Sequence, residues 1–345
     1  MTPLTVTPIA YLDEGTSEDR QCRIFFDFQD LPVVTGCLGN GCTASADHFD
    51  RGCSTARSTK LKVGKRWQQT MKPRQFQAFS DFERAGWEDA GTVARYDEHL
   101  SVVTTQSIPA VLDDADVHAG SRVLDVATGA GHLAAAVLRR GGDPIGIDFS
   151  AAQVQLARDR YPSVRFEQAD AEALPFEPGT FDAVVNAFGI CHLPNPDLSL
   201  REANRVLRRG GRVAFSVWDV PERAIGVGAV YAAIRTHGSM DVGLPAGPSF
   251  FLFSDPEQSI KALHDAGFDS PTVRQVPQVW RIADPDKLFD MIAGSSVRAG
   301  ATLRAQNHAA REAIRTALRE TVSEYKCGSH FEIPMPAIVA TAIKP

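Results

Sequence analysis

A buried strand runs into a glycine loop at Val123-Leu124-Asp125-Val126-Ala127-Thr128-Gly129-Ala130-Gly131. The apolar residues on both faces of 122–126 predict a strand that is covered on both sides. Gly129 and Gly131 let the backbone turn sharply and approach a ligand closely. A glycine pair alone is weak evidence, but it gains weight here because a helix is predicted directly after it, over 131–140.

Short apolar runs alternate with helical segments through most of the remaining chain. Ser150 is expected to cap one helix, and Asp197 a second helix that ends at Gly210-Gly211. The pattern predicts an α/β fold with a doubly wound, mostly parallel seven-stranded sheet and right-handed crossovers. The predicted strands are 122–126, 144–147, 164–168, 181–187, 212–218, 272–282 and 337–343. The predicted helices are 131–140, 151–160, 197–207, 227–234, 257–266, 286–291 and 303–325, preceded by helical spacing through 71–100.

Two further acids follow predicted strands. Asp148 precedes Phe149, and a carboxylate there can accept hydrogen bonds from both ribose hydroxyls while the ring lies against adenine. Asp170 follows the next strand and can accept from an adenine amino group. Together with Asp125, these acids at three strand ends predict a nucleoside pocket. The structural alternatives are a helix cap for Asp148, a surface turn for Asp170 and an acceptor of loop amides for Asp125.

An ordered set of motifs carries a family resemblance. The core from Val123 to Trp218 resembles the class I S-adenosylmethionine-dependent methyltransferases, which have a Rossmann-like fold, and in particular small-molecule members akin to quinone-biosynthesis methyltransferases. The set is far more specific than any one of its members. The motifs are Leu124–Gly131, Asp148–Ser150, Asp170–Phe176, Phe181–Val185 and Arg205–Arg212.

The resemblance implies S-adenosyl-L-methionine as the cofactor and assigns binding roles at the strand ends. Asp125, Gly129 and Gly131 would face the methionine part, and Asp148 would hold the ribose. The last strand, 337–343, would insert antiparallel near the sheet edge. The remaining implied contacts are Phe149 on the adenine face, Asp170 and Ala171 at the adenine, and Asn186 near the amino acid group.

Methyl transfer from a sulfonium is an in-line displacement, so the protein must place the acceptor atom ~3 Å from the methyl carbon and exclude water. A base is needed only when the acceptor is a poorly ionised hydroxyl or a carbon acid. His192, which follows the fourth strand, is a candidate base, and the structural alternative is that it fixes the loop before Pro194. No other catalytic residue is assigned. Further candidate ligand contacts are Tyr96, His99, Gln106 and the apolar run Phe250–Phe253.

Two other functions fit parts of the pattern. An NAD(P)-dependent oxidoreductase would use Gly129–Ala134 as a loose dinucleotide loop. Against it, no Tyr is followed four positions later by Lys, and the motif around Asp170 has no role in it. A non-catalytic S-adenosylmethionine-binding protein is the third hypothesis, and turnover with a panel of acceptors would separate it from an enzyme.

Composition narrows the partners. The 345 residues have a formal net charge of −6 and no long basic patch, so no nucleic-acid partner is expected. No run of about 18 apolar residues predicts a membrane span. Six cysteines without a secretory signal predict reduced thiols and a cytoplasmic location. A zinc site at Cys37, Cys42, His48 and Cys53 lacks the usual spacing, so no metal is expected. The expected partner is a small-molecule methyl acceptor, and the sequence does not determine the oligomeric state.

The chain changes character near residue 71. Residues 1–70 have poor periodicity, and we expect a poorly structured N-terminal extension, either disordered or a wrongly assigned start; the alternative is a small accessory domain. Residues 71–345 are expected to form the methyltransferase domain. Its predicted parts are a helical cap (71–118), the cofactor-binding core (119–218), and an insertion with lid helices and the final strands (219–345).

Overall fold

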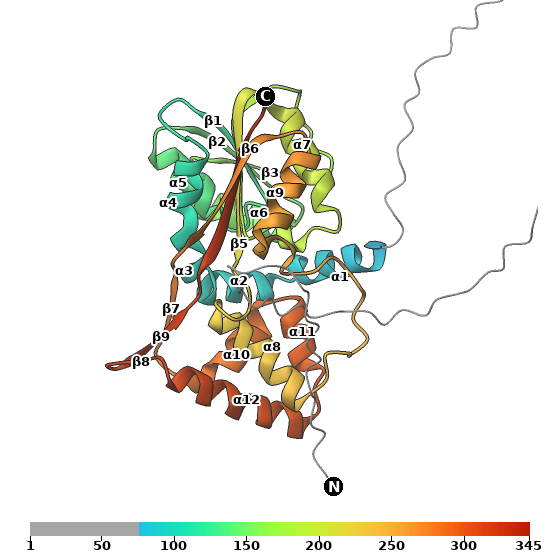
Figure 1. The fold of residues 1–345 in the computed structure, drawn as a ribbon, viewed down its shortest axis with the longest axis vertical. Coiled ribbons are helices and arrows are strands. Elements are labelled where there is room, and N and C mark those ends of the chain that lie inside the picture. Colours follow the sequence, from blue (N-terminus) through green and yellow to red (C-terminus); the bar gives the residue numbers. More distant parts are fainter. Residues whose placement is uncertain (1–75) are drawn as a thin grey trace, which may run out of the picture. The chain divides into compact units, whose positions relative to one another are not determined.

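The computed structural model describes residues 76–345, which are built around a twisted seven-stranded sheet (Figure 1). The strand order is β3-β2-β1-β4-β5-β10-β6. The first five strands in that order are parallel, and β10 runs antiparallel to both β5 and β6. The predicted doubly wound, mostly parallel sheet is therefore confirmed. The strands are β1 (Arg122–Val126), β2 (Asp143–Asp148), β3 (Arg165–Gln168), β4 (Phe181–Ala187), β5 (Leu207–Trp218), β6 (Asp269–Val276) and β10 (Ala337–Ile343).

Helices cover both faces of this sheet. Alternate residues of each strand point to opposite faces, so Val123 packs toward α4 (Ile108–Asp114) and α5 (His132–Arg139). Its neighbour Leu124 lies in the core shared with α7 (Pro196–Val206) and α9 (Pro256–Asp265). In Figure 1, α4 and α5 lie on one side of the sheet and α7 and α9 on the other. The helix α6 (Ala151–Arg160) packs against β2 and β3.

Local signals near the glycine loop fold as expected. The Ser150 hydroxyl accepts from the backbone N–H of Gln153 at 3.1 Å, so the predicted cap of α6 is confirmed. Gly131 precedes α5 with φ +83°, a conformation that disfavours any residue with a Cβ. A Cβ there would lie 2.7 Å from the ring of Phe166 on β3, so both backbone geometry and packing require glycine.

The predicted range of α7, 197–207, agrees with the structure to within one residue, but its predicted cap and its predicted stop signal are wrong. Asp197 lies inside the first turn, makes no capping hydrogen bond, and follows the cap position of Asn195. Gly210-Gly211 lies within β5, where Gly210 has φ +75° and the pairing with β4 shifts register. The backbone becomes extended at Leu207, and Lys344 Nζ donates to the Asn204 and Leu207 carbonyls at this helix end, at 2.7 and 2.8 Å. A sequence pattern could not show this contact, which joins residues about 140 positions apart.

The predicted sixth strand, 272–282, was expected to be interrupted by Pro277, which has no N–H to donate to a ladder, and the break occurs there. The two parts lie in different sheets, which the sequence did not predict. Beyond the break, β7 (Val279–Ile282) pairs with β9 (His330–Pro334). The short strand β8 (Lys326–Cys327) completes a three-stranded sheet, β7-β9-β8, of which β8 and β9 were not predicted.

A second helical layer packs around its own apolar core. The helical spacing predicted through 71–100 corresponds to two helices in the described residues, α1 and α2. The carboxylate of Asp89 accepts from the Thr92 N–H and caps the start of α2. The predicted helix 303–325 likewise divides, because Asn307 caps its second part. In the described part of the chain, no helix is long and apolar enough to cross a membrane. The helices are α1 (Gln77–Glu88), α2 (Ala90–His99), α3 (Ser101–Thr104), α8 (Ile225–His237), α10 (Leu288–Ser295), α11 (Arg298–Arg304) and α12 (His308–Ser323).

Figure 1 shows α1 and α2 lying between the strand ends of the large sheet and the layer formed by α8, α10, α11 and α12. The helices α10 and α2 pack against each other, as do α8 and α12. Side chains from both layers therefore meet at this level. The expectations for residues 1–70, including the zinc alternative, lie outside the described residues and remain predictions.

Candidate functional site

The main cavity opens at the carboxyl ends of β1, β2 and β4. It holds about 820 Å³ of space, including its open mouth, and lies where ligands bind in open parallel sheets. It is lined by Asp125, Ala127, Thr128, Gly129, Asp148, Phe149, Gln153, Phe188, Gly189 and His192 from the core, and by Trp87, Tyr96 and Asp97 from the helices above it.

Asp125 lies at the end of β1 and is 1% exposed. Its Oδ2 accepts from the Thr128 hydroxyl at 2.6 Å and from the Ala134 N–H at 3.0 Å, which ties the glycine loop to the start of α5. Burial raises the pKa of Asp125 to about 7, against the lowering effect of these two hydrogen bonds, and the neighbouring charge of Asp148 adds to the rise. Asp125 therefore both braces the loop and faces the cavity.

Asp148 ends β2 beside it. Its Oδ2 accepts from the Gly129 N–H at 3.0 Å and its Oδ1 from the Ser150 N–H at 2.9 Å. Burial raises the pKa of Asp148 to about 6, although both hydrogen bonds lower it. A carboxylate offers about four acceptor positions, so lone pairs remain for ligand hydroxyls.

The glycine loop leaves open space above its backbone. Gly129 has φ +54°, and a Cβ built there meets nothing closer than Gln153 Oε1 at 3.8 Å, so this position faces the cavity. Ala127 and Phe188, which also line the cavity, have φ of +55° and +59°. Left-handed backbone outside glycine is costly and concentrates at functional sites.

Asn186 holds the two loops together rather than lining the cavity. Its Nδ2 donates to the Val126 carbonyl at 2.7 Å, and its Oδ1 accepts from Gly189 and Ile190, both at 3.0 Å. It is absent from the described residues that line the cavity. The expected contact with the cofactor's amino acid group remains a prediction.

The third acid borders an adjoining pocket. Asp170 lines it with Ala171, and Asp148, Phe149 and His192 border both spaces. The three predicted acids and Gly129 therefore meet at one edge of the sheet, as expected, whereas Gly131 packs against Phe166 and lines neither pocket.

One contact of Asp170 comes from outside the core. Arg84 on α1 donates to Asp170 Oδ2 at 2.9 Å, and its guanidinium carbon lies 4.9 Å from the centroid of the Phe149 ring. The helix α1 therefore reaches directly over the predicted adenine site.

A second cavity adjoins the first on the side of the helical layer. It holds about 640 Å³ and is mostly apolar and aromatic. Trp87, Tyr96, Phe188 and His192 line both cavities, so these four side chains form the shared wall. The rest is lined by Leu100, Trp218, Val227, Val230, Tyr231, Phe250, Ile292, Ser296, Val297, Arg298 and Ala299.

Comparisons with known proteins agree with this geometry. Residues 124–215 match the family described as methyltransferase domain. The chain is 33% identical over 155 residues to the demethylmenaquinone methyltransferase of Clavibacter sepedonicus, covering 44% of this chain and 60% of that protein. Residues 124–215 therefore carry a methyltransferase domain, and over this core the chain is similar to class I S-adenosylmethionine-dependent methyltransferases. The cofactor of this family is S-adenosylmethionine, as expected.

Two further known proteins are similar to parts of this chain. The ubiquinone/menaquinone biosynthesis C-methyltransferase UbiE of Idiomarina loihiensis is 38% identical over 122 residues, covering 33% of this chain and 49% of that protein. The chain thus spans only about half to three fifths of these curated relatives. The solved phosphoethanolamine N-methyltransferase 2 of Haemonchus contortus with S-adenosyl-L-methionine is 18% identical, covering 77% of this chain and 60% of that chain, with a TM-score of 0.47.

The methyltransferase core fits its cofactor chemically. Ribose hydroxyls require acceptors, and the cationic sulfonium and ammonium groups favour anionic surroundings. Asp125, Asp148 and Asp97 all line the main cavity. The bare backbone at Gly129 leaves room for close approach of a ligand.

Glu83, which the sequence analysis did not single out, holds two residues of the shared wall, His192 and Trp87. Glu83 Oε2 accepts from His192 Nδ1 at 3.0 Å and from Trp87 Nε1 at 3.1 Å, and Glu83 is 3% exposed. The available signal was a carboxylate inside the apolar stripe Phe79, Glu83, Trp87 of α1, at spacings of four residues. The contact between Glu83 and His192 joins residues 109 positions apart, so no local sequence pattern predicts it.

The charge state of His192 follows from these neighbours. Burial alone would lower the pKa of His192, but Cys191 and the hydrogen bond and charge of Glu83 raise it well above its ordinary value. This shift favours the protonated imidazole. Nδ1 faces the Glu83 carboxylate at 3.0 Å, and the ring borders both cavities.

A second polar network borders the cofactor cavity. His132 Nε2 contacts Asp97 Oδ1 at 2.7 Å and its Nδ1 contacts the Tyr161 hydroxyl at 2.8 Å. Arg160 also pairs with Asp97. Desolvation of Asp97 is outweighed by His132 and Arg160, so the pKa of Asp97 lies well below its usual range and the carboxylate stays charged.

Of the other candidate ligand contacts, some line a cavity and others only bond to the surrounding backbone or side chains. Tyr96 lines both cavities, whereas the Gln106 side chain bonds the Val279 backbone and lines neither. His99 also lines neither and lies 4.0 Å from Glu98. Within the apolar run, Phe250 lines the second cavity and Phe253 lies in the core below the sheet, so both interpretations of that run hold in part.

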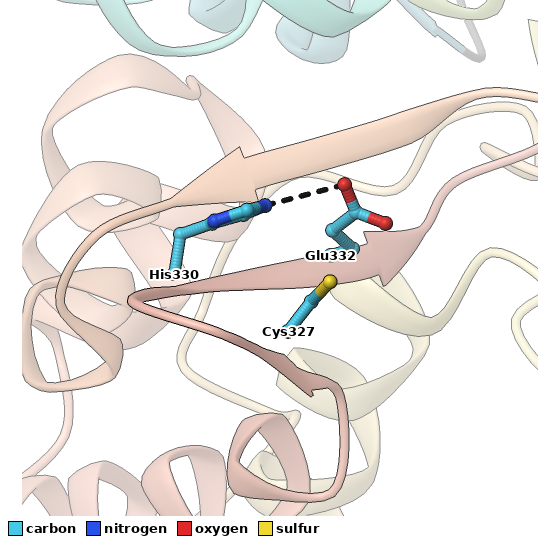
Figure 2. Close-up of side chains that lie close together, drawn as sticks. All are labelled: Cys327, His330 and Glu332. Atoms are coloured by element: carbon cyan, nitrogen blue, oxygen red, sulfur yellow. Dashed lines mark hydrogen bonds and ion pairs between the residues drawn. The ribbon is translucent and has the colours of Figure 1, made fainter.

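A separate cluster lies on the hairpin of β8 and β9 (Figure 2). Cys327 pairs opposite His330, and Glu332 lies two residues further on, so all three side chains share one face. Their ligand atoms lie within 4.8 Å of one another, close enough for one metal ion. Arg281 already pairs with Glu332 at 2.9 Å, however, and a cation would have to compete with that guanidinium. None of the three lines either cavity described above.

Proposed function

We propose that this chain transfers a methyl group from S-adenosylmethionine to a small, apolar acceptor by in-line displacement. The observation that carries the proposal is the shared wall, in which Trp87, Tyr96, Phe188 and His192 border both the main cavity and the aromatic cavity. Residues that line both cavities lie where a ligand in one cavity would approach a ligand in the other, as in-line transfer requires.

The residues of the first cavity would hold the cofactor. Asp148 would accept from the ribose hydroxyls, Asp170 and Ala171 would meet the adenine, and Phe149 would lie against its face. Asp125 would brace the loop that faces the methionine part. When bound, the cofactor supplies an electrophilic methyl group on a sulfonium.

The residues of the second cavity would hold the acceptor and exclude water. Its aromatic walls favour a flat, apolar molecule. His192, protonated and anchored by Glu83, would donate a hydrogen bond to an acceptor oxygen and stabilise it as an anion, the form that attacks. In this role His192 acts as a hydrogen-bond donor. The candidate base role considered from the sequence would instead require a neutral imidazole.

The small-molecule class of the acceptor draws support from two directions. Part of the wall of the aromatic cavity comes from α10 and α11, which supply Ile292 and Ala299. The names of the relatives refer to methylation in quinone biosynthesis, which is a small-molecule reaction of those proteins. We propose the same broad class here.

Calorimetry with S-adenosylhomocysteine and with NAD tests the cofactor assignment. We expect S-adenosylhomocysteine to bind and NAD to give no heat, whereas binding of NAD alone would refute the proposal. Turnover is tested by release of S-adenosylhomocysteine with a panel of phenolic and enolic acceptors. Cofactor binding without turnover on any acceptor would instead favour the non-catalytic binding protein.

The role of His192 has its own readout, a pH profile of kcat/KM. We expect an alkaline fall in wild type, because the donor is lost as pH rises through the raised pKa of His192. His192→Gln keeps an N–H donor but cannot titrate, so the alkaline fall should disappear. A profile in which wild-type activity rises steadily with pH through this range would favour a base instead.

A further inference from the structure

The aromatic cavity contains one cationic side chain that its fold does not neutralise. Among the described residues that line the cavity, Arg298 is the one Lys or Arg, and none is an Asp or Glu. Arg298 starts α11 and is half-buried. It belongs to the part of the wall that does not border the cofactor cavity.

Two contacts hold Arg298 in place without cancelling its charge. Its Nη1 donates to the Pro245 carbonyl at 2.8 Å, and its guanidinium carbon lies 5.7 Å from the centroid of the Phe79 ring. Within residues 76–345, no carboxylate forms an ion pair with it. A guanidinium has five N–H groups, so most of its donors remain unused.

Tyr231 adds a neutral donor next to this charge. Its ring lines the cavity, and the charge of Arg298 acts on its hydroxyl. Burial raises the pKa of Tyr231 to about 12 in spite of that charge, so the hydroxyl keeps its proton at neutral pH. The wall thus presents a guanidinium and a phenol, both of which donate.

We propose that Arg298 and Tyr231 form a subsite for a carboxylate carried by the acceptor, on the side of the cavity away from the methyl group. The inference rests on the proposed function and names its substrate class as a planar, apolar acid. Arginine binds carboxylates through paired N–H groups, and it does so more strongly where water is excluded. The aromatic walls bind the ring system, and the subsite would orient its nucleophilic end toward His192.

The test uses 2-naphthoate and its neutral counterpart 2-naphthamide, titrated calorimetrically into the full chain saturated with S-adenosylhomocysteine. The two probes share a ring system and differ in charge. Loss of a hydrogen bond to a charged group corresponds to about tenfold to hundredfold in affinity, so wild type should prefer the acid by about that factor. Arg298→Gln, which keeps a donor for Pro245, should bind both probes within about twofold. Tyr231→Phe should lower the preference by about two- to tenfold.

Arg319→Gln is the matched control, because Arg319 lies on α12, pairs with Asp286 and lines neither cavity. It should keep the full preference for the acid. Equal affinities in wild type, no binding of 2-naphthoate, or a preference that survives in Arg298→Gln would each overturn the subsite. Failure of wild type to bind S-adenosylhomocysteine would instead refute the methyltransferase proposal, and the comparison of the two probes without cofactor would still test Arg298.

Discussion

Replacing Asp148 by Asn removes a charge at the centre of the predicted cofactor site with little change in size. In the native protein the carboxylate accepts from Gly129 and Ser150 at 3.0 and 2.9 Å. An amide keeps one acceptor oxygen, and its NH2 group would face the other backbone N–H. We expect the affinity for S-adenosylhomocysteine to fall by about tenfold to hundredfold, which is ~1.5–3 kcal/mol for loss of a charged acceptor.

The pH dependence of binding gives a second expected result. Ribose hydroxyls favour the ionised carboxylate, whereas the free protein holds the pKa of Asp148 at about 6. Binding should therefore release protons, and wild-type affinity should weaken by about tenfold for each pH unit below that pKa. The Asn variant should show a shallower dependence, with the remaining slope contributed by Asp125, whose pKa is about 7.

Isothermal titration calorimetry from pH 5 to pH 8 measures both effects, and thermal melts confirm that each variant is folded. Asp143→Asn is the matched control, because Asp143 lies at the other end of the same strand and is exposed. It should bind like wild type at every pH. A folded Asp148→Asn variant with an unchanged dissociation constant would refute the assigned role.

Three further outcomes concern stability. Gly131→Ala should lower the free energy of unfolding by roughly 2–4 kcal/mol in urea melts, since φ is +83° and the Cβ would meet Phe166. The control Gly179→Ala, where φ is +73° with nothing within 4 Å, should lower it by only about 1–2 kcal/mol. Equal losses in the two variants would contradict the packing argument. Lys344→Met should cost roughly 1–3 kcal/mol by freeing two carbonyls of the α7 end, and an unchanged melt would contradict that role. The raised pKa of His192 stabilises the fold fully below pH ~6.5 and progressively less as pH rises through the raised value, so wild type should lose stability at alkaline pH and His192→Gln should not show that loss.

The helical layer above the strand ends depends on contacts that no sequence pattern contains. Glu83 meets His192 across 109 positions, and Arg84 meets Asp170 across 86. The contact at the end of α7 is also long-range, because Lys344, which donates to carbonyls there, directly follows β10. Composition around 71–100 predicts helices, but it does not say which side chains they bring to the core.

Local chemistry was sufficient for the core itself. The strand and glycine loop at 122–131, the cap at Ser150 and the acids Asp125, Asp148 and Asp170 follow from side-chain periodicity and backbone preferences, which act over a few residues. Parallel strands then bring those acids to one edge, because their carboxyl ends point the same way. Tertiary structure alone decided the aromatic cavity, the partner of His192 and the absence of an ion pair at Arg298 in the described part of the chain, because burial and charge pairing depend on segments that are distant along the chain.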